Sequence, residues 1–209
     1  ISHDLRTPLT AISGYLQLLQ GQDLPPDTRR YLEQIDNRTQ AMKRLTEELF
    51  RYSVVVSEEK LAREPVDLCR AVEEALLSFY GALEGRGIEP QVRLPEEKVE
   101  RLLDPAALSR VLGNILTNAL KYSAGDLEVT LEERGRLTFS NAAPGLDPVT
   151  AGRLFDRFYT VEAARNSTGL GLSIAKELTQ RMDGSIGAAL HGGTLTVWVE
   201  FPREELDRK

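Results

Sequence analysis

The sequence contains a single cysteine, Cys69, among its 209 residues. One cysteine excludes an internal disulfide and a metal cage built from several cysteines, and it suits a reducing compartment. The sequence also lacks an excess of positive charge, because 32 acidic residues outnumber 26 basic ones and the formal net charge is −6. Proteins that bind nucleic acid in general carry a basic stripe or domain, so no nucleic-acid partner is expected.

Long hydrophobic runs are absent too: no stretch approaches the roughly 18 apolar residues that span a bilayer, and no signal peptide is found. We expect this portion to be cytoplasmic, with any attachment to the inner membrane made only by upstream segments. Ile1 is an abrupt place to start a helix, which indicates a fragment. With 41% hydrophobic and 28% charged residues, the chain has the composition of a globular protein, and its length suits two domains.

Residues 1–62 are predicted to form an antiparallel helical hairpin. The apolar residues of the first helix recur at alternating spacings of four and three: Leu5, Leu9, Ile12, Leu16 and Leu19. Pro25-Pro26 and the polar residues before them end this helix, and a second helix with similar spacing continues to Val56. Such spacing is typical of a helix-bundle seam. Two helices with one apolar stripe each cannot close a core alone, so we predict a homodimer with a four-helix bundle.

Residues 63–209 are predicted to form an α/β sandwich of mostly antiparallel strands with helices on one face, which makes the whole chain α+β. A polar run over 57–65 is interpreted as a linker. Helices are predicted over 67–84, 104–122 and 169–182, with a short one opened by Asp147-Pro148. Strands are predicted over 88–94, 99–103, 127–132, 136–141, 185–190 and 194–201.

The opening stretch ISHDLRTPL places a titratable ring in a weakened helix. His3 is roughly 160° around the helix from the seam residue Leu5, so it is predicted to face solvent. Thr7, four residues on, returns to nearly the same face, and Asp4 adjoins the ring. Pro8 cannot donate a hydrogen bond to the carbonyl of Asp4, which loosens the helix there. A lone histidine in such a place is most often an ordinary surface residue.

The order His-Asp-Leu-Arg-Thr-Pro-Leu, however, resembles the phosphoacceptor box of sensor histidine kinases from two-component systems. The resemblance implies that His3 is phosphorylated and that Asp4 takes the ring proton during attack. It also implies that Thr7 orients water for the reverse, phosphatase reaction on a partner. That partner is the receiver domain of a response regulator, whose aspartate accepts the phosphate.

A polar stripe follows on the helix predicted over 104–122. Asn114, Asn118 and Lys121 fall at i, i+4 and i+7, and the other face of the helix is apolar. Amide oxygens can bind Mg²⁺ and lysine can meet a phosphate, although a polar outer face would show the same pattern. The spelling N-x-x-x-N-A-x-K-Y resembles the family's N box. The resemblance assigns Asn118 to Mg²⁺, with Asn114, Lys121 and Tyr122 around ATP.

Glycines open the helix predicted over 169–182, where they allow backbone N–H groups to approach a phosphate. A GxG pair alone is weak support, but this one follows FDRFYT, which resembles the family's F box. The resemblance implies that Thr168, Gly169, Leu170 and Gly171 bind the nucleotide in a Bergerat-type catalytic domain. The residues between Tyr159 and Gly169 would form a lid, shorter than is common in the family.

One box departs from the family pattern. Asn141 stands where the family has an aspartate that accepts a hydrogen bond from the adenine amino group, and Ala143 replaces a glycine, whereas Gly145 remains. The amide oxygen can still accept, but the lost charge weakens the bond by roughly 1 kcal/mol. Alanine also restricts a turn that glycine leaves free. A working kinase with altered nucleotide affinity and a decayed kinase that acts as a dimeric signalling scaffold both fit.

The sequence therefore predicts an ATP- and Mg²⁺-dependent protein histidine kinase that phosphorylates His3 and passes the phosphate to a response regulator. A second enzymatic hypothesis is simple ATP hydrolysis, as in gyrase-like relatives. Those relatives use a glutamate one turn before the Mg²⁺-binding asparagine to activate water, and here that position is Asn114, which cannot act as a base. Phosphoryl transfer is favoured over hydrolysis for this reason.

Overall fold

The computed structural model describes residues 2–57, 60–157, 159 and 169–203; within the first two helices, the side chains of residues 2–6, 48 and 51–57 lie outside this description. The chain divides into two compact units, and the change from one to the other comes after Ser57. Each unit is described by itself below. Among the described residues, no helix combines the length and the apolar character needed to cross a membrane.

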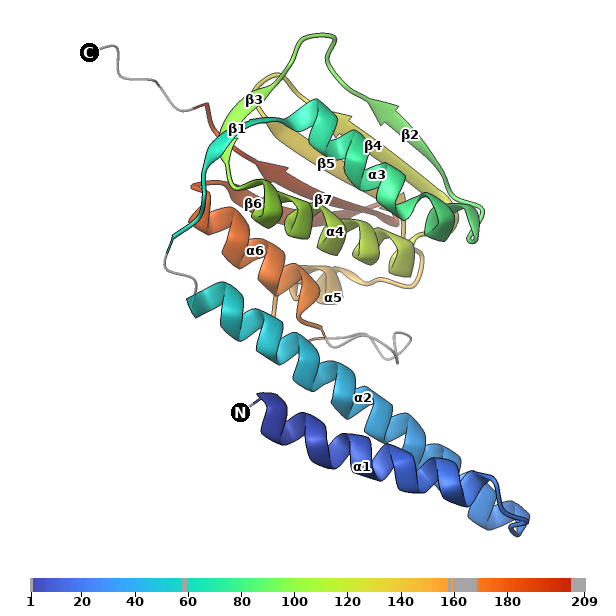
Figure 1. The fold of residues 1–209 in the computed structure, drawn as a ribbon. Helices are drawn as coiled ribbons and strands as arrows, with labels where there is room; N and C mark the ends of the chain where they lie inside the picture. The colour runs from blue at the N-terminus through green and yellow to red at the C-terminus, as the bar shows by residue number, and fades with distance from the viewer. Residues whose placement is uncertain (1, 58–59, 158, 160–168, 204–209) are drawn as a thin grey trace. The chain divides into compact units, whose positions relative to one another are not determined.

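The first unit is an antiparallel helical hairpin of α1 (Ser2–Gln20) and α2 (Pro26–Ser57), which lie side by side in Figure 1. Pro8 lies within α1 without ending it. Pro26 is the first residue of α2, where its missing N–H costs nothing, and Asp27 follows in the first turn, where a negative charge is favoured. The predicted hairpin is confirmed.

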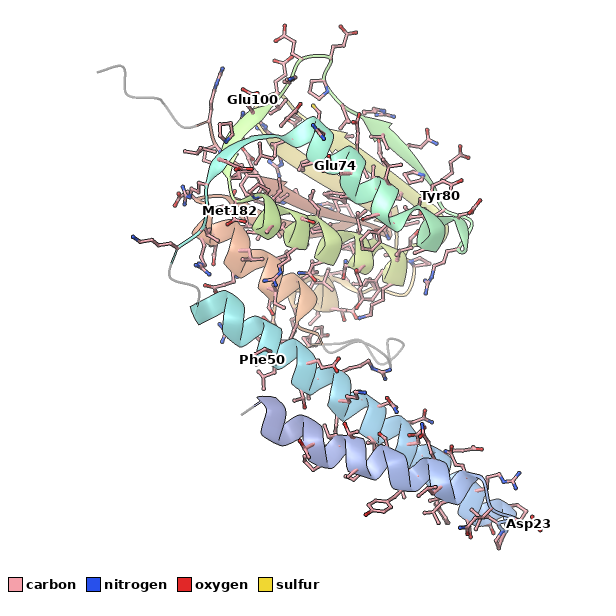
Figure 2. The ribbon with its side chains drawn as sticks, viewed as in Figure 1. Asp23, Phe50, Glu74, Tyr80, Glu100 and Met182 are labelled. Atoms are coloured by element: carbon pink, nitrogen blue, oxygen red, sulfur yellow. The ribbon has the colours of Figure 1, made fainter. Side chains whose placement is uncertain are left out.

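The hairpin buries only part of its apolar seam. Leu9 and Leu16 of α1 are buried, but Ile12 and Leu19 between and beyond them are 41% and 38% exposed. In α2 the predicted seam is exposed at Tyr31, Ile35, Met42, Leu45 and Leu49. Phe50, labelled in Figure 2, is exposed as well. One hairpin therefore leaves a long row of large apolar side chains without cover in the described part of the unit.

The second unit is a five-stranded sheet in the order β2-β4-β5-β7-β6, with a separate two-stranded sheet of β1 and β3. The strands are β1 (Glu64–Asp67), β2 (Glu89–Arg93), β3 (Glu100–Leu103), β4 (Asp126–Leu131), β5 (Arg136–Ala142), β6 (Ser185–His191) and β7 (Thr194–Glu200). The helices are α3 (Leu68–Glu84), α4 (Pro105–Tyr122), α5 (Pro148–Gly152) and α6 (Gly171–Arg181). Among these described strands, only β2 and β4 pair in parallel. Helices α3, α4 and α6 cover one face of the large sheet (Figure 1), which confirms the α+β prediction.

Three aspartates cap the helices whose starts they predict. The side chain of Asp67 accepts a hydrogen bond from the N–H of Cys69, that of Asp104 from Ala107, and that of Asp147 from Thr150. Each carboxylate thereby satisfies an N–H that the first helical turn leaves without a backbone partner.

Two predicted boundaries are wrong. The linker predicted over 57–65 includes the start of β1, whose four residues pair with β3 in the register Glu64↔Leu103. A short strand that contains Pro65 shows no alternation of apolar residues, so only its partner reveals it. The last helix begins at Gly171 rather than at 169, because Gly169 has a φ of +73°, outside the helical region.

The core lies between the sheet and α3, α4 and α6. Alternate residues of β5 and β7 point inward, and among them Leu137, Phe139, Leu195 and Val199 are buried. Helix α4 contacts β5 on this side of the sheet, and the residues of its apolar face are almost completely buried: Leu108, Leu112, Ile115 and Leu116. Each side chain of this size contributes about 1.5–3 kcal/mol on burial, so this layer fixes α4, with its polar stripe, against the sheet.

Arg101 of β3 is a charged residue buried next to the β4–β5 turn and the end of β7. Its guanidinium donates hydrogen bonds to the carbonyls of Phe201 (2.8 Å), Glu100 (2.8 Å) and Glu133 (3.1 Å). Burial, and next the positive charge of Arg203, lowers the pKa of the guanidinium. The side chain thus joins β3, the β4–β5 turn and the residue that follows β7.

Gly135 packs against this arginine, and we expect Gly135→Ala to destabilise the fold. Its φ is +92°, and an added Cβ would collide with the carbonyl of Phe201 and lie 2.6 Å from Nη2 of Arg101. Backbone strain and collision together should lower the free energy of unfolding by about 2–4 kcal/mol. Urea unfolding followed by the fluorescence of the single tryptophan, Trp198 in β7, measures the loss.

Gly192→Ala is the matched control. Gly192 also has a positive φ, +56°, but a Cβ there would meet nothing within 4 Å. It should lose only about 1 kcal/mol, from backbone strain alone. Equal losses in the two variants would show that the packing of Gly135 against Arg101 contributes nothing.

Candidate functional site

The polar stripe of α4 faces the protein rather than the solvent. Asn118 is buried, and Asn114 and Lys121 are half-buried, although all three are polar. This burial does not fit the outer face of an amphipathic helix, where polar side chains remain exposed. The stripe is therefore a polar lining supported by the apolar face of the same helix.

Asn118 has an unsatisfied group. Its side-chain amide nitrogen is buried and has no hydrogen-bond partner; among the described residues only one other buried side-chain atom, the hydroxyl of Thr179, shares this property. A buried polar group without a partner costs about 1–3 kcal/mol, and such groups in folded proteins call for a specific explanation. A ligand with acceptor oxygens, bound beside α4, would supply one.

The start of α6 lies against Asn114. A Cβ added at Gly171 would be 3.2 Å from the side-chain oxygen of Asn114, so only a glycine fits there without displacing that amide. The N-cap of α6, Leu170, makes no side-chain hydrogen bond to the first turn of this helix. Uncapped N–H groups at the start of a helix favour an anion. The fold thus brings the N-terminus of α6 to the polar stripe of α4.

Lys121 and Tyr122 occupy the end of α4. The Lys121 ammonium lies 4.7 Å from the centroid of the Tyr122 ring, and burial lowers the pKa of Lys121. Burial, and next the nearby Tyr159, raises the pKa of Tyr122. A partly desolvated ammonium is stabilised by a nearby anion, so a phosphate beside Lys121 would oppose the lowering of its pKa.

Tyr159 is joined to α5 by a chain of hydrogen bonds that the sequence did not reveal. The Thr150 hydroxyl donates to the Asp147 carboxylate over 2.7 Å, so at its 3.2 Å contact with Thr150 the Tyr159 hydroxyl is the donor. These bonds from Thr150, through its side chain and its N–H, lower the pKa of Asp147. Arg153 stacks 4.0 Å from the centroid of the Tyr159 ring. The sequence predicts Asp147 as a helix cap, but its connection to Tyr159 through Thr150 can be found only from the three-dimensional structure.

Asn141, the penultimate residue of β5, is buried, and its amide nitrogen donates to the carbonyl of Ala142 over 3.1 Å. Ala143 is also buried, and its N–H donates to the carbonyl of Gly193 over 2.8 Å. Neither Ala143 nor Gly145 has a positive φ. Alanine at position 143 is therefore compatible with this turn, and the expected restriction carries no strain here.

Two family models match the chain. Residues 103–205 match the model of histidine kinase-, DNA gyrase B- and HSP90-like ATPases, and residues 1–54 match the His Kinase A (phospho-acceptor) domain. The chain belongs to the sensor histidine kinases of two-component systems. Its second unit therefore carries the ATP-binding domain of that family, and its first carries the phosphoacceptor hairpin.

Individual relatives agree with this assignment. The chain is 31% identical over 198 residues to the sensor histidine kinase YcbM of Bacillus subtilis (strain 168), a match that covers 89% of the chain and 64% of YcbM. It thus spans less than two-thirds of that relative. The solved structure of the Acinetobacter baumannii histidine kinase AdeS superposes with a TM-score of 0.69 at 26% identity, over 98% of this chain and 100% of AdeS. Full-length ShkA, solved in complex with AMPPNP, gives a TM-score of 0.68 at 26% identity over 96% of this chain and 44% of ShkA.

The structure brings together some of the predicted site residues of this histidine kinase and leaves others undescribed. Asn114 meets Gly171, and Tyr122 neighbours Tyr159. Leu170 is buried directly before α6. Thr7 is exposed on α1. The side chains of His3 and Asp4, residue Thr168, and the predicted lid over 160–168 lie outside the described residues.

Proposed function

We propose that the chain is an ATP-dependent autophosphorylating histidine kinase whose phosphoacceptor is His3. The observation that carries the proposal is the buried amide nitrogen of Asn118, which has no hydrogen-bond partner within the described structure and lies on one stripe with Asn114 and Lys121. A nucleotide triphosphate would offer acceptor oxygens to this amide nitrogen and negative charge to Lys121. In the same helix, position 114 holds an amide rather than a base for water, which supports transfer over hydrolysis.

The nucleotide would lie between α4 and the start of α6. Phosphates would contact the ammonium of Lys121 and the backbone N–H groups of the segment Gly169, Leu170 and Gly171 at the start of α6. These are the cationic group and the hydrogen-bond donors of the lining. Tyr122, Gly145 and, outside the described residues, Thr168 belong to the same proposed site. Asn141, buried at the end of β5, would face the adenine amino group with its amide oxygen.

Mg²⁺ fits the same stripe. Asn118 would hold it through its amide oxygen, a ligand type that this hard cation accepts. No group of three or more His, Cys, Asp or Glu side chains able to hold a metal occurs within the described ranges, so phosphate oxygens and water would complete the coordination. When bound, Mg²⁺ offsets charge on the transferred phosphoryl group. The chain's own residues bind the nucleotide and fix its position.

In the transfer step, one nitrogen of the neutral His3 ring attacks the γ-phosphorus in line. A nitrogen–phosphorus bond forms while the bond to the bridging oxygen of ATP breaks, and ADP leaves. Asp4 holds the opposite ring nitrogen and takes its proton, so that the ring remains neutral. The phosphoryl group then passes to an aspartate of a response-regulator receiver domain, and Thr7 would orient water for the phosphatase reaction.

A homodimer is the proposed assembly. The exposed apolar residues of α1 and α2 support it, because a second hairpin would bury them in a four-helix bundle. Two domains, 1–62 and 63–209, are proposed for each chain. The bond from the N–H of Ala62 to Asp104 (2.8 Å) and the ion pair of Arg63 with Asp183 (2.6 Å) support a start of the catalytic domain close to this boundary.

Incubation with γ-labelled ATP and Mg²⁺ tests the function. We expect label on the protein that is stable in alkali and lost in acid, as for a phosphorus–nitrogen bond. Free labelled phosphate without labelled protein would instead indicate an ATPase. An intact dimer that neither carries label nor releases phosphate would indicate a signalling scaffold without kinase activity. The motive for testing this alternative is Asn141, which stands where the family has an aspartate.

A further inference from the structure

Both backbone groups of Ala142, the residue after Asn141, are held by the segment that follows α4. The N–H of Ala142 donates to both carboxylate oxygens of Asp126, at 2.9 Å each. Its carbonyl accepts from the N–H of Ala124 at 3.0 Å. The N–H of Ala142 belongs to the peptide group that joins Asn141 to Ala142. Because a bond to a carboxylate is stronger than a neutral one, Asp126 firmly fixes the backbone directly after Asn141.

The segment that holds Ala142 is itself fixed to α4. Ser123 is the C-cap of that helix, and its N–H donates to the carbonyl of Ala119 over 2.8 Å. The hydroxyl of Ser123 in turn accepts from the N–H groups of Gly125 (2.9 Å) and Asp126 (3.0 Å). The position of the Asp126 carboxylate therefore follows from the end of the helix that carries Asn118.

The Ala142 carbonyl receives a second hydrogen bond, from the amide nitrogen of Asn141 at 3.1 Å. An asparagine side chain has a donor end and an acceptor end, which exchange by a half-turn of the amide. The observed orientation leaves the oxygen as the end available to a ligand. The opposite orientation would bring the Asn141 oxygen against the Ala142 carbonyl oxygen and lose the bond.

We propose that Asp126 is a positioning residue for purine selectivity. By fixing the peptide group between Asn141 and Ala142, it sets the backbone from which the Asn141 amide reaches the Ala142 carbonyl with its oxygen outward, so that Asn141 accepts from an amino group at position 6 of the purine. This inference rests on the proposed function, in which Asn141 faces adenine. An aspartate at position 141 presents an acceptor oxygen to the purine in either orientation, because both of its oxygens accept, although its other oxygen then faces the Ala142 carbonyl without a hydrogen bond.

The test compares the dissociation constants of ATP and ITP for the full chain with Mg²⁺, since hypoxanthine carries an oxygen where adenine carries the amino group. The unmodified chain should prefer ATP by about tenfold or more. Asp126→Ala should reduce the preference to about threefold or less, because the released amide can turn its nitrogen toward the oxygen of ITP. Glu132→Ala, which removes an exposed acid paired with Arg134, is the control and should leave the ratio unchanged.

A second pair of variants separates orientation from general damage. Asn141→Asp should prefer ATP strongly, and it should do so equally with and without Asp126→Ala, since a carboxylate has no donor end to turn. If Asp126 only supported the local structure, its loss would weaken ATP and ITP alike in both backgrounds.

The outcomes also separate this inference from the proposed function. An ATP preference that Asp126→Ala leaves intact, or equal affinities for ATP and ITP in the unmodified chain, overturns the role of Asp126 and leaves the kinase proposal standing. Failure of the unmodified chain to bind either nucleotide overturns the proposed function, and this inference with it.

Discussion

His3→Gln should abolish labelling of the protein by γ-labelled ATP, with a loss of roughly a hundredfold or more, down to background. The imidazole is the proposed nucleophile, and a glutamine amide has no lone pair of comparable reactivity, so the covalent step is lost rather than slowed. ATP binding should be unchanged, because the nucleotide is held by residues of the second unit. Equilibrium binding measured beside the labelling reaction distinguishes a lost acceptor from a lost substrate.

The chain offers a matched control for this experiment. It contains two histidines, and the other, His191, is exposed at the end of β6. His191→Gln should retain full labelling, whereas the double variant should carry no acid-labile label. Acid-labile label that persists in His3→Gln and disappears in His191→Gln would move the phosphoacceptor to the second unit and contradict the assignment.

Local signals predicted most of this fold. Aspartates before helices, the glycines after α3 and the alternation along β5 and β7 each act over a few residues, and each placed its element to within about two residues. The sequence did not predict β1, because its four residues form a strand only through their pairing with β3. A strand whose stability comes from a distant partner leaves no periodic signal in its own sequence.

The candidate site shows the same division. The spacing of Asn114, Asn118 and Lys121 is local, so the stripe was visible in the sequence, but its burial depends on how α4 packs against the sheet. The contact of Asn114 with Gly171 joins two helices far apart in the chain. The hold of Asp126 on Ala142 likewise follows from the pairing of β4 with β5, and an exposed aspartate after a helix carries no sign of it.

Asn118→Ala is the second variant with a large expected effect. Loss of the amide removes the proposed Mg²⁺ ligand, so labelling should fall roughly a hundredfold or more at saturating ATP and Mg²⁺. Thr117→Ala is the control, because Thr117 is the preceding residue of α4, is exposed, and donates its hydroxyl hydrogen to the carbonyl of Gly113 within the same helix over 2.7 Å. Its labelling should match that of the unmodified chain. Full labelling of Asn118→Ala would remove the Mg²⁺ assignment.

The free energy of unfolding independently tests whether Asn118 serves ligand binding or packing. Its amide nitrogen is buried without a partner, which costs the nucleotide-free protein about 1–3 kcal/mol. Asn118→Leu, of similar size and without polar atoms, should therefore raise the free energy of unfolding by about 1 kcal/mol while abolishing labelling. A residue retained for packing would lose stability and activity together. Opposite changes in the two quantities are expected only if the amide is kept, at a cost to the fold, for a ligand that binds beside it.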